Sequence, residues 1–438
     1  MRAVALPRHV VVALSAWGSR VVSAGSQLLV IRLALPILGE TDFARFSILT
    51  GLLVWFMLVE FGLGPSVQNL LAEFRAEGRV AGVVLRAASV LALVVMTVAT
   101  AILWAVAAPA QSFLFRQLGP SSVADAHVLG VVGTLLIATT IANISTRVFY
   151  GDMRGDLANG YTAIGYLASL AAVFALTRHM PATGHLLWLL VAWTAPRAAV
   201  CALACVHVAI RFDAWSAPSD GELVRRLWSA SWRFGGFAIL SAFVLGMDYL
   251  VMSQTLTSAE IVEYTVASKV LTLAIFLYSS LRDAAWPVAT YALARGETAP
   301  VRRLTRQLVV TGVVLVAAGT AAFAWLTVPV TSLLAGGSAS PARAGVIFSI
   351  GGYYLLRVWS DTFAMVLQSR GRLRVFWLYV PVQALVSAAA QYWLSLRYGV
   401  YGIIAGLSLS FLVTAVWILP VAYERLLGES GARPPVPA

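Results

Sequence analysis

The chain is poor in charge. Only 11% of its 438 residues are Asp, Glu, Lys or Arg, whereas 60% are hydrophobic. A soluble domain carries about 25% charged residues, so the composition excludes an ordinary soluble fold. Apolar runs of about 20 residues recur from end to end, and each can cross about 30 Å of hydrocarbon. We therefore expect an all-α integral membrane protein.

Lysine and cysteine are almost absent. Lys269 is the only lysine among 31 basic residues. The arginines that produce the net charge of +12 lie in short segments between apolar runs, which argues against a nucleic-acid partner. Cys201 and Cys205 share one apolar run, which favours packing over metal or redox chemistry.

Enzyme motifs are also lacking. The sequence contains no P-loop, no GxSxG and no metal-spaced cluster of His and Asp. We therefore expect no cofactor, no metal and no enzymatic activity. The N-terminus is basic and then apolar without a convincing cleavage site, so it predicts a first membrane helix and not a removed signal.

Hydropathy predicts about twelve transmembrane helices. They fall near 10–34, 45–70, 83–107, 128–149, 159–178, 186–210, 234–256, 264–291, 308–330, 344–368, 375–396 and 401–423. Most arginines between the spans fall on one side, which places both termini in the cytoplasm.

The segment between the sixth and seventh spans divides them into two sets of six. The expected organisation is an N-terminal lobe, a cytoplasmic linker, a C-terminal lobe and a cytoplasmic tail, over 1–210, 211–233, 234–423 and 424–438. Phe46 to Gly78 and Tyr264 to Gly296 match at one offset of about half the chain. This predicts two six-helix lobes related by a pseudo-two-fold axis along the membrane normal.

Ionisable residues interrupt the predicted spans. They are Arg20, Glu60, Arg197, Asp248, Lys269, Arg282, Asp283, Arg357 and Asp361. Each costs about 2.5–3.5 kcal/mol at a helix centre. Facing lipid, the set would cost on the order of 20 kcal/mol, more than a typical net stability of about 5–15 kcal/mol. Most are expected to face each other or a water-filled cavity.

The roles of several of these ionisable residues have two interpretations. Ser15, Ser19, Ser23 and Gln27 form a polar stripe beside Arg20, which either lines a cavity or packs helix on helix. Glu60 and Asp248 either bind a coupling ion or pair with a cation such as Arg20.

The ionisable residues of the C-terminal half also allow more than one interpretation. Arg357 and Asp361 are four residues apart and so can pair on one helix face. Lys269 either lines a cavity or extends outward, and Arg282 with Asp283 suits a cavity or the membrane interface. The sequence does not choose between readings of Arg197.

The segment FGLGP interrupts the second span just after Glu60. Gly62, Gly64 and Pro65 loosen this helix, and Pro287 is expected to do the same in the eighth span. The break is either a hinge for transport or an ordinary membrane-helix kink.

The first 80 residues resemble a known family. The resemblance rests on Gly18 to Leu29, Arg32, LGETDFARFSIL, EFGLG with Ser66, Gln68 and Asn69, and AEFRAEGR. These segments resemble the bacterial polysaccharide transporters (Wzx-type O-antigen and lipid-linked oligosaccharide flippases) of the multidrug/oligosaccharidyl-lipid/polysaccharide (MOP) exporter superfamily. Where this family often has Asp-Phe-Gly, the chain has Glu60-Phe61-Gly62, which keeps the carboxylate.

The resemblance implies two lobes around a central cavity and movement of an undecaprenyl-pyrophosphate-linked oligosaccharide to the outer leaflet of the bacterial cytoplasmic membrane. Polysaccharide polymerase and chain-length regulator are the implied partners. Arg20, Lys269, Arg282 and Arg357 would bind the pyrophosphate. The acids Glu60, Asp248 and Asp361 would couple transport to a proton or sodium gradient or form salt bridges.

Two other functions compete with this one. A drug or cation exporter of the same superfamily would favour acids over cations in its cavity, whereas this chain leans basic. A membrane glycosyltransferase, polymerase or ligase would need a substantial outward loop with catalytic residues, and the predicted outward loops are short.

Overall fold

The computed structural model describes residues 8–119, 127–152, 154–179, 184–218, 220–335, 340–370, 372 and 374–431. Every regular element in these ranges is a helix. The chain divides into two compact units, Met1–Ala242 and Phe243–Ala438.

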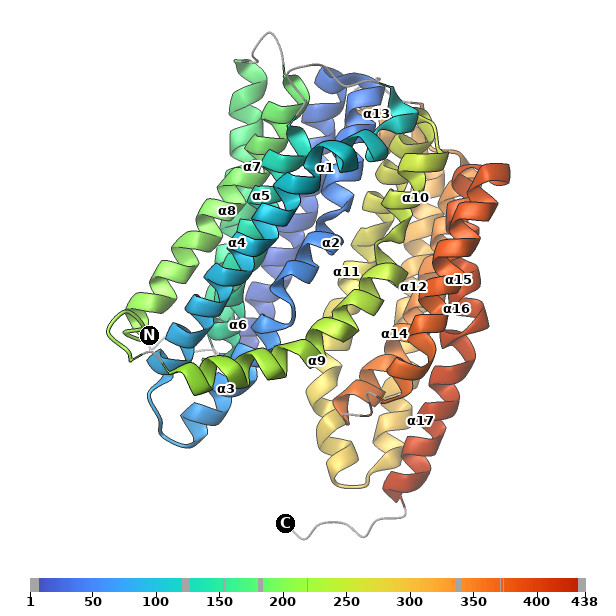
Figure 1. Cartoon of the computed structure of the whole chain (residues 1–438). Coiled ribbons are helices and arrows are strands. Elements are labelled where there is room, and N and C mark those ends of the chain that lie inside the picture. Colours follow the sequence, from blue (N-terminus) through green and yellow to red (C-terminus); the bar gives the residue numbers. More distant parts are fainter. Residues whose placement is uncertain are drawn as a thin grey trace, which may run out of the picture. The chain divides into compact units, whose positions relative to one another are not determined.

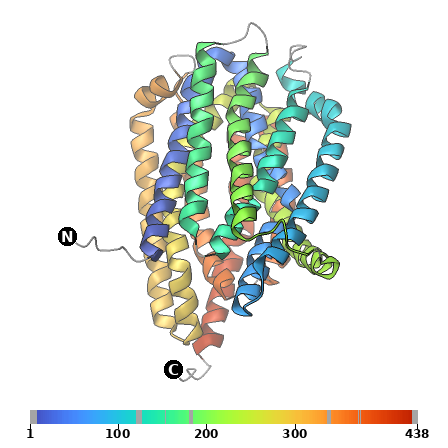
Figure 2. The ribbon, with the colours of Figure 1, turned by 90° about the vertical axis from the view of Figure 1, so that its left-hand side faces the viewer.

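The first unit contains ten helical elements and most of an eleventh (Figure 1). They are α1 (Arg8–Gly51), α2 (Leu53–Phe56), η1 (Met57–Glu60), α3 (Leu63–Ala76), α4 (Ala81–Leu114), η2 (Arg116–Leu118), α5 (Val128–Ala142), α6 (Ile144–Gly151), α7 (Gly155–Arg178), α8 (His185–Arg211) and α9 (Gly221–Leu245). Helix α7 packs between α1 and α8, and these helices run side by side (Figure 2).

Helix α1 is two helices joined at a kink. Gly39 has a non-helical backbone (φ 68°, ψ −178°) inside its 44 residues. At 1.5 Å per residue a straight helix of that length would measure about 66 Å, about twice the hydrocarbon thickness. The kink therefore separates the first predicted span from the start of the second.

Helix α9 packs into the hydrophobic core of the first unit. Leu63 and Phe74 of α3, Val148 of α6, and Leu223 and Leu227 of α9 belong to one buried apolar cluster. The segment 211–233, expected to be a linker, therefore contributes part of a packed helix, and the boundary between the units falls inside that helix after Ala242.

The second unit begins with the last residues of α9 and contains eight further helices. They are α10 (Met247–Thr255), α11 (Ser258–Ala294), α12 (Thr298–Trp325), α13 (Thr327–Ala335), α14 (Ala344–Ser369), α15 (Arg374–Tyr398), α16 (Val400–Val413) and α17 (Ala415–Gly431). Helices α11 and α12 form a hairpin that packs on α14 (Figure 1).

Helices α15 and α16 approach each other closely through small residues. A Cβ at Gly402 would lie 2.2 Å from the Leu394 carbonyl carbon, and one at Gly406 would lie 2.4 Å from the Gln391 amide nitrogen. Gly402 and Gly406 have the GxxxG spacing that lets membrane helices pack backbone on backbone.

Eight of the described helices are long and apolar enough to cross a membrane, or nine if the pair α9–α10, bent by 41°, counts as one span. The sequence predicted about twelve. The first two predicted spans lie within one continuous candidate, Leu14–Glu60, and α14 and α15, which match the predicted spans 344–368 and 375–396, are not among the eight. Twelve spans in two six-helix lobes remain a prediction.

Candidate functional site

The chain breaks directly after Glu60, within the FGLGP segment. Helix η1 ends at Glu60, and Phe61 and Gly62 both have left-handed backbones, with φ of 47° and 74°. Such a conformation is rare for a bulky residue such as Phe. Pro65 lies in the first turn of α3, where a missing N–H breaks no helical hydrogen bond. The break is therefore built by Phe61 and Gly62, and its use as a hinge remains a prediction.

Helix α9 packs directly against this break. The ring of Phe61 lies 5.5 Å from the Trp228 ring and 5.2 Å from the Trp232 ring, measured between centroids. A Cβ at Gly62 would lie 2.5 Å from Phe234 Cβ and 2.6 Å from the Ser231 carbonyl oxygen. The left-handed turn is thus clamped by one face of α9, and glycine is required at position 62 for both conformation and space.

Arg147 of α6 lies beside the Glu60 carboxylate. A Cβ at Gly64 would lie 1.8 Å from Glu60 Oε1 and 3.0 Å from Arg147 Cγ, and the two charges attract each other. The Oε1 atom is buried and has no hydrogen-bond partner among the described residues. The sequence suggested an arginine such as Arg20 for this role. The structure places Arg147 there, and Arg20 lies half-buried on α1.

The serine stripe of α1 is used in part for helix packing. The side-chain amide of Asn159 on α7 donates to Ser15 Oγ at 3.0 Å. Ser19 and Ser23 are buried, and Ser23 Oγ donates to the Ser19 carbonyl at 2.7 Å. These contacts favour the packing reading for Ser15 in particular.

Arg197 packs against an aromatic ring in the first unit. Its guanidinium carbon lies 4.4 Å from the centroid of the Tyr166 ring, a cation–π distance. It also lines a cavity of about 20 Å³ with Trp193 and Thr194. That volume suits about one water molecule and is too small for a transported molecule.

Asp248 opens α10 in the second unit. Tyr264 of α11 donates its hydroxyl to Asp248 Oδ2 at 2.8 Å, and the Lys269 ammonium attracts the same carboxylate. Asp248 also lies in the first turn of α10, where a helix favours negative charge. Lys269 itself is half-buried on α11.

Four charges meet where α11 and α14 pack together. This cluster, named the Asp361 cluster, consists of Arg282, Asp283, Arg357 and Asp361. Arg357 Nη2 lies 3.1 Å and Arg282 Nη1 3.4 Å from Asp361 Oδ2, and Arg282 Nη2 lies 3.2 Å from Asp283 Oδ1. The spacing-based prediction that Arg357 and Asp361 pair is confirmed. Their side chains are 23% and 21% exposed, so the cluster is neither sealed from solvent nor fully in water.

Tyrosine hydroxyls surround these charges. Arg357 donates to the Tyr353 hydroxyl at 3.4 Å, and Tyr354 bonds Thr272 of α11 at 2.9 Å. The Tyr278 hydroxyl bonds Thr362 Oγ1 at 2.7 Å. Sequence reasoning missed these tyrosines. The spacing of Tyr353, Arg357 and Asp361, every four residues along one helix face, was the available signal.

The described residues contain no group of three His, Cys, Asp or Glu side chains placed to hold a metal ion. The side chains described above supply guanidinium and ammonium cations, carboxylates and hydroxyls. Such groups bind anions and monovalent cations and exchange protons.

Pro287, the predicted hinge residue of the second unit, is not part of the Asp361 cluster, and α11 runs through this position as one helix.

The chain resembles transporters along its whole length, although no family model matches it. It is 32% identical over 425 residues to an O-antigen transporter of Salmonella typhi, covering 97% of this chain and 98% of that protein. It is 30% identical over 429 residues to an O-antigen export protein of Yersinia pseudotuberculosis, covering 96% of each.

Solved structures share the fold. A multidrug-resistance MATE family transporter of the MOP superfamily, in an inward-facing conformation, aligns with a TM-score of 0.75 at 12% identity, covering 96% of this chain and 100% of that one. The lipid II flippase MurJ, in an inward closed conformation, aligns with a TM-score of 0.70 at 11% identity, covering 96% and 90%. The chain is thus a multi-pass membrane protein with a MOP superfamily fold, and it belongs to the family of bacterial O-antigen transporters and not to a family of enzymes.

Proposed function

We propose that this protein is a flippase for an undecaprenyl-pyrophosphate-linked oligosaccharide. It would move this lipid from the inner to the outer leaflet of the cytoplasmic membrane by alternating access, for surface polysaccharide biosynthesis. The O-antigen cargo in the names of the relatives supports the substrate class. The observation that carries the proposal is the convergence of Arg282 and Arg357 on the single carboxylate of Asp361.

Two guanidinium groups on one carboxylate suit exchange with a pyrophosphate. Guanidinium binds phosphate through paired N–H donors. The contacts to Asp361, at 3.1 and 3.4 Å, are longer than the roughly 2.7–2.9 Å of a strong charged hydrogen bond. Arg357 Nε is also buried without a partner among the described residues. Asp361 would therefore hold the two arginines until phosphate oxygens replace it, and Lys269 and Arg20 remain the further cations for this cargo.

Ion coupling is the second part of the proposal. Glu60 Oε1 is buried and has no hydrogen-bond partner among the described residues, although Arg147 lies beside the carboxylate, and buried acceptors of this kind call for a partner. A proton or a sodium ion would fill that role. Asp248, which accepts from Tyr264, is the corresponding acid of the second unit. Dissipating both the proton and the sodium gradient across proteoliposomes should slow transport, and an unchanged rate would remove coupling from the proposal.

The cationic site is tested by flipping of a fluorescent pyrophosphate-linked sugar lipid in proteoliposomes. Arg357→Gln removes a charged hydrogen bond worth about 1.5–3 kcal/mol, so the rate should fall roughly tenfold to 150-fold. Arg303→Gln is the matched control, because Arg303 is an exposed arginine of α12 outside the cluster. Wild-type flipping by Arg357→Gln would overturn the assignment.

Drug export is the rival activity, since the MATE neighbour shares the fold. The same proteoliposomes should therefore be loaded with cationic dyes. Dye efflux together with no flipping of the sugar lipid would replace the proposed substrate by an organic cation.

A further inference from the structure

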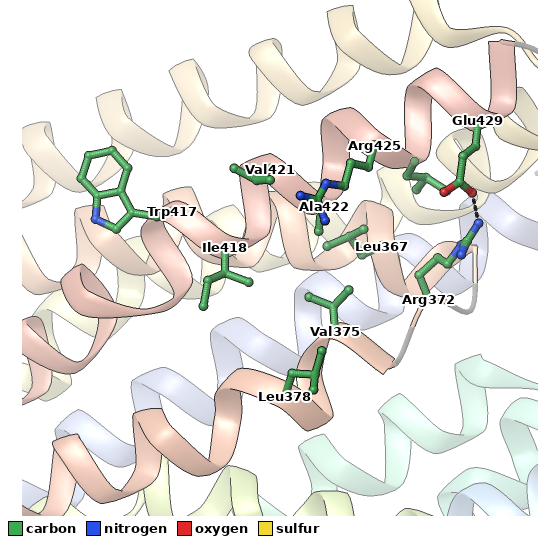
Figure 3. A pocket seen from close by; sticks show the side chains of 11 residues that line it. Leu367, Arg372, Val375, Leu378, Trp417, Ile418, Val421, Ala422, Arg425 and Glu429 are labelled. Atoms are coloured by element: carbon green, nitrogen blue, oxygen red, sulfur yellow. Dashed lines mark hydrogen bonds and ion pairs between the residues drawn. The ribbon is translucent and has the colours of Figure 1, made fainter.

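A groove lies on the second unit, away from the charges discussed above. Its volume is about 420 Å³. It is lined by residues of α14, α15 and α17 and of the turn between α14 and α15 (Figure 3). The α17 residues recur as Trp417, Ile418, Val421, Ala422 and Arg425, so one face of that helix forms a wall of the groove.

The groove has an apolar body and a charged end. Trp417 lies at one end, and Arg425, Arg372 and Glu429 lie at the other (Figure 3). Arg372 forms an ion pair with Glu429. No ion pair or hydrogen bond of the Arg425 side chain to another described residue is found, and this side chain is exposed. The charged end therefore keeps one positive charge in excess.

The body of the groove is open to its surroundings. Leu378 is 72% exposed, Trp417 68% and Val421 52%. Eight positions separate Trp417 from Arg425 on a helix that rises 1.5 Å per residue, about 12 Å in all. One leaflet of a bilayer contributes about 15 Å of hydrocarbon. The groove thus has nearly the length of one leaflet, with its arginines at one end.

We propose that this groove binds one anionic phospholipid, with its phosphate at Arg425 and Arg372 and an acyl chain along Val421, Ala422 and Leu378. Charge complementarity supports this occupant, because arginines near the membrane surface attract anionic lipids. The arginine distribution of the sequence also predicts that this end of the helices faces the cytoplasm. The site is separate from the Asp361 cluster and does not depend on which molecule is transported.

The test uses the full-length protein in nanodiscs of phosphatidylethanolamine. Trace amounts of a phosphatidylglycerol with a photoreactive acyl chain are added, and the crosslinked peptides are mapped. Labelling is expected on 417–426 of α17 and on the start of α15. Loss of one interfacial arginine should reduce labelling by the anionic probe about fivefold, so Arg425→Gln should show that decrease.

Two further variants separate the charge from the apolar body. Ala422→Phe fills the groove without changing charge and should also reduce the labelling, with unchanged thermal unfolding as evidence that the protein is folded. Arg303→Gln, on α12, should label as the wild type does. Equal labelling by a photoreactive phosphatidylethanolamine would show lipid contact without selection and overturn the proposal. Displacement by undecaprenyl phosphate, with phosphatidylglycerol unable to compete, would assign the groove to the carrier lipid and overturn it as well.

Discussion

Gly62→Ala should destabilise the first unit strongly. An alanine at φ 74° costs about 1–2 kcal/mol from backbone crowding. Its Cβ would also lie 2.5 Å from Phe234 Cβ and 2.6 Å from the Ser231 carbonyl oxygen. Overpacking of this kind costs about 1–3 kcal/mol. The atoms in the way belong to the α9 backbone and to a Cβ, which cannot rotate aside, so we expect a total loss of roughly 2–5 kcal/mol.

Thermal unfolding of the detergent-purified protein measures this loss. The chain has 14 tryptophans, and Trp228 and Trp232 lie against the break, so fluorescence reports on the affected region. A unit of 150–250 residues shifts its midpoint by about 2–4 °C per kcal/mol. The midpoint of Gly62→Ala should therefore fall by about 4–20 °C.

Gly160→Ala is the matched control, because it introduces the same methyl group into the same unit. Position 160 lies inside α7, and a Cβ there would meet nothing within 4 Å. Alanine favours a helix over glycine by up to about 1 kcal/mol, so the midpoint should hold or rise slightly. Equal midpoints for the two variants would refute the argument that α9 clamps the break.

Three further predictions concern single side chains. Gly64→Ala should leave the unfolding midpoint within a few degrees but slow transport, because its Cβ would displace the movable Glu60 carboxylate 1.8 Å away; unchanged flipping in proteoliposomes would contradict this. Gly402→Ala should lower the free energy of unfolding by about 1–3 kcal/mol, because its Cβ would lie 2.2 Å from the backbone of α15, and a wild-type unfolding curve would count against that packing. Arg20→Ala should abolish surface polysaccharide while protein levels in the membrane stay normal, as judged by polysaccharide staining and immunoblotting; normal polysaccharide would remove Arg20 from the substrate path.

Helix geometry explains which contacts were readable from the sequence. Arg357 and Asp361 are four residues apart, so the turn of a helix brings them together, and the pair is found at 3.1 Å. The break after Glu60 was also predictable, because Gly62 adopts a left-handed backbone without steric cost. Both predictions used only residues that are neighbours along the chain.

Contacts between residues far apart in the sequence could not be predicted in this way. Arg282 reaches Asp361 across 79 positions, and Arg147 reaches the neighbourhood of Glu60 from another helix. No local spacing encodes either approach. Arg45 is a further example: it is buried, pairs with Asp42 at 2.5 Å and donates to the Leu118 carbonyl, 73 positions away, at 2.9 Å.

The number of spans differs for a physical reason. Hydropathy marks apolar stretches, whereas the backbone helix continues through polar residues, so α1 runs past the end of the first predicted span to its kink at Gly39. Charged side chains lower the hydropathy of α14, which carries Arg357 and Asp361 and is not among the eight clear candidates. Length and composition alone therefore undercount helices that carry charged residues.

The position of α9 has a consequence for experiments that cut the chain in two. The boundary between the compact units falls after Ala242, inside a continuous helix. A cut in the preceding loop near 216 would give α9 to the C-terminal fragment, although Trp228 and Trp232 cover Phe61 in the N-terminal one. An N-terminal fragment made this way would expose its broken helix, so the two fragments should be stable only when produced together. A cut at Gly246, between α9 and α10, would leave α9 with its partners and keep the helices of the second unit together.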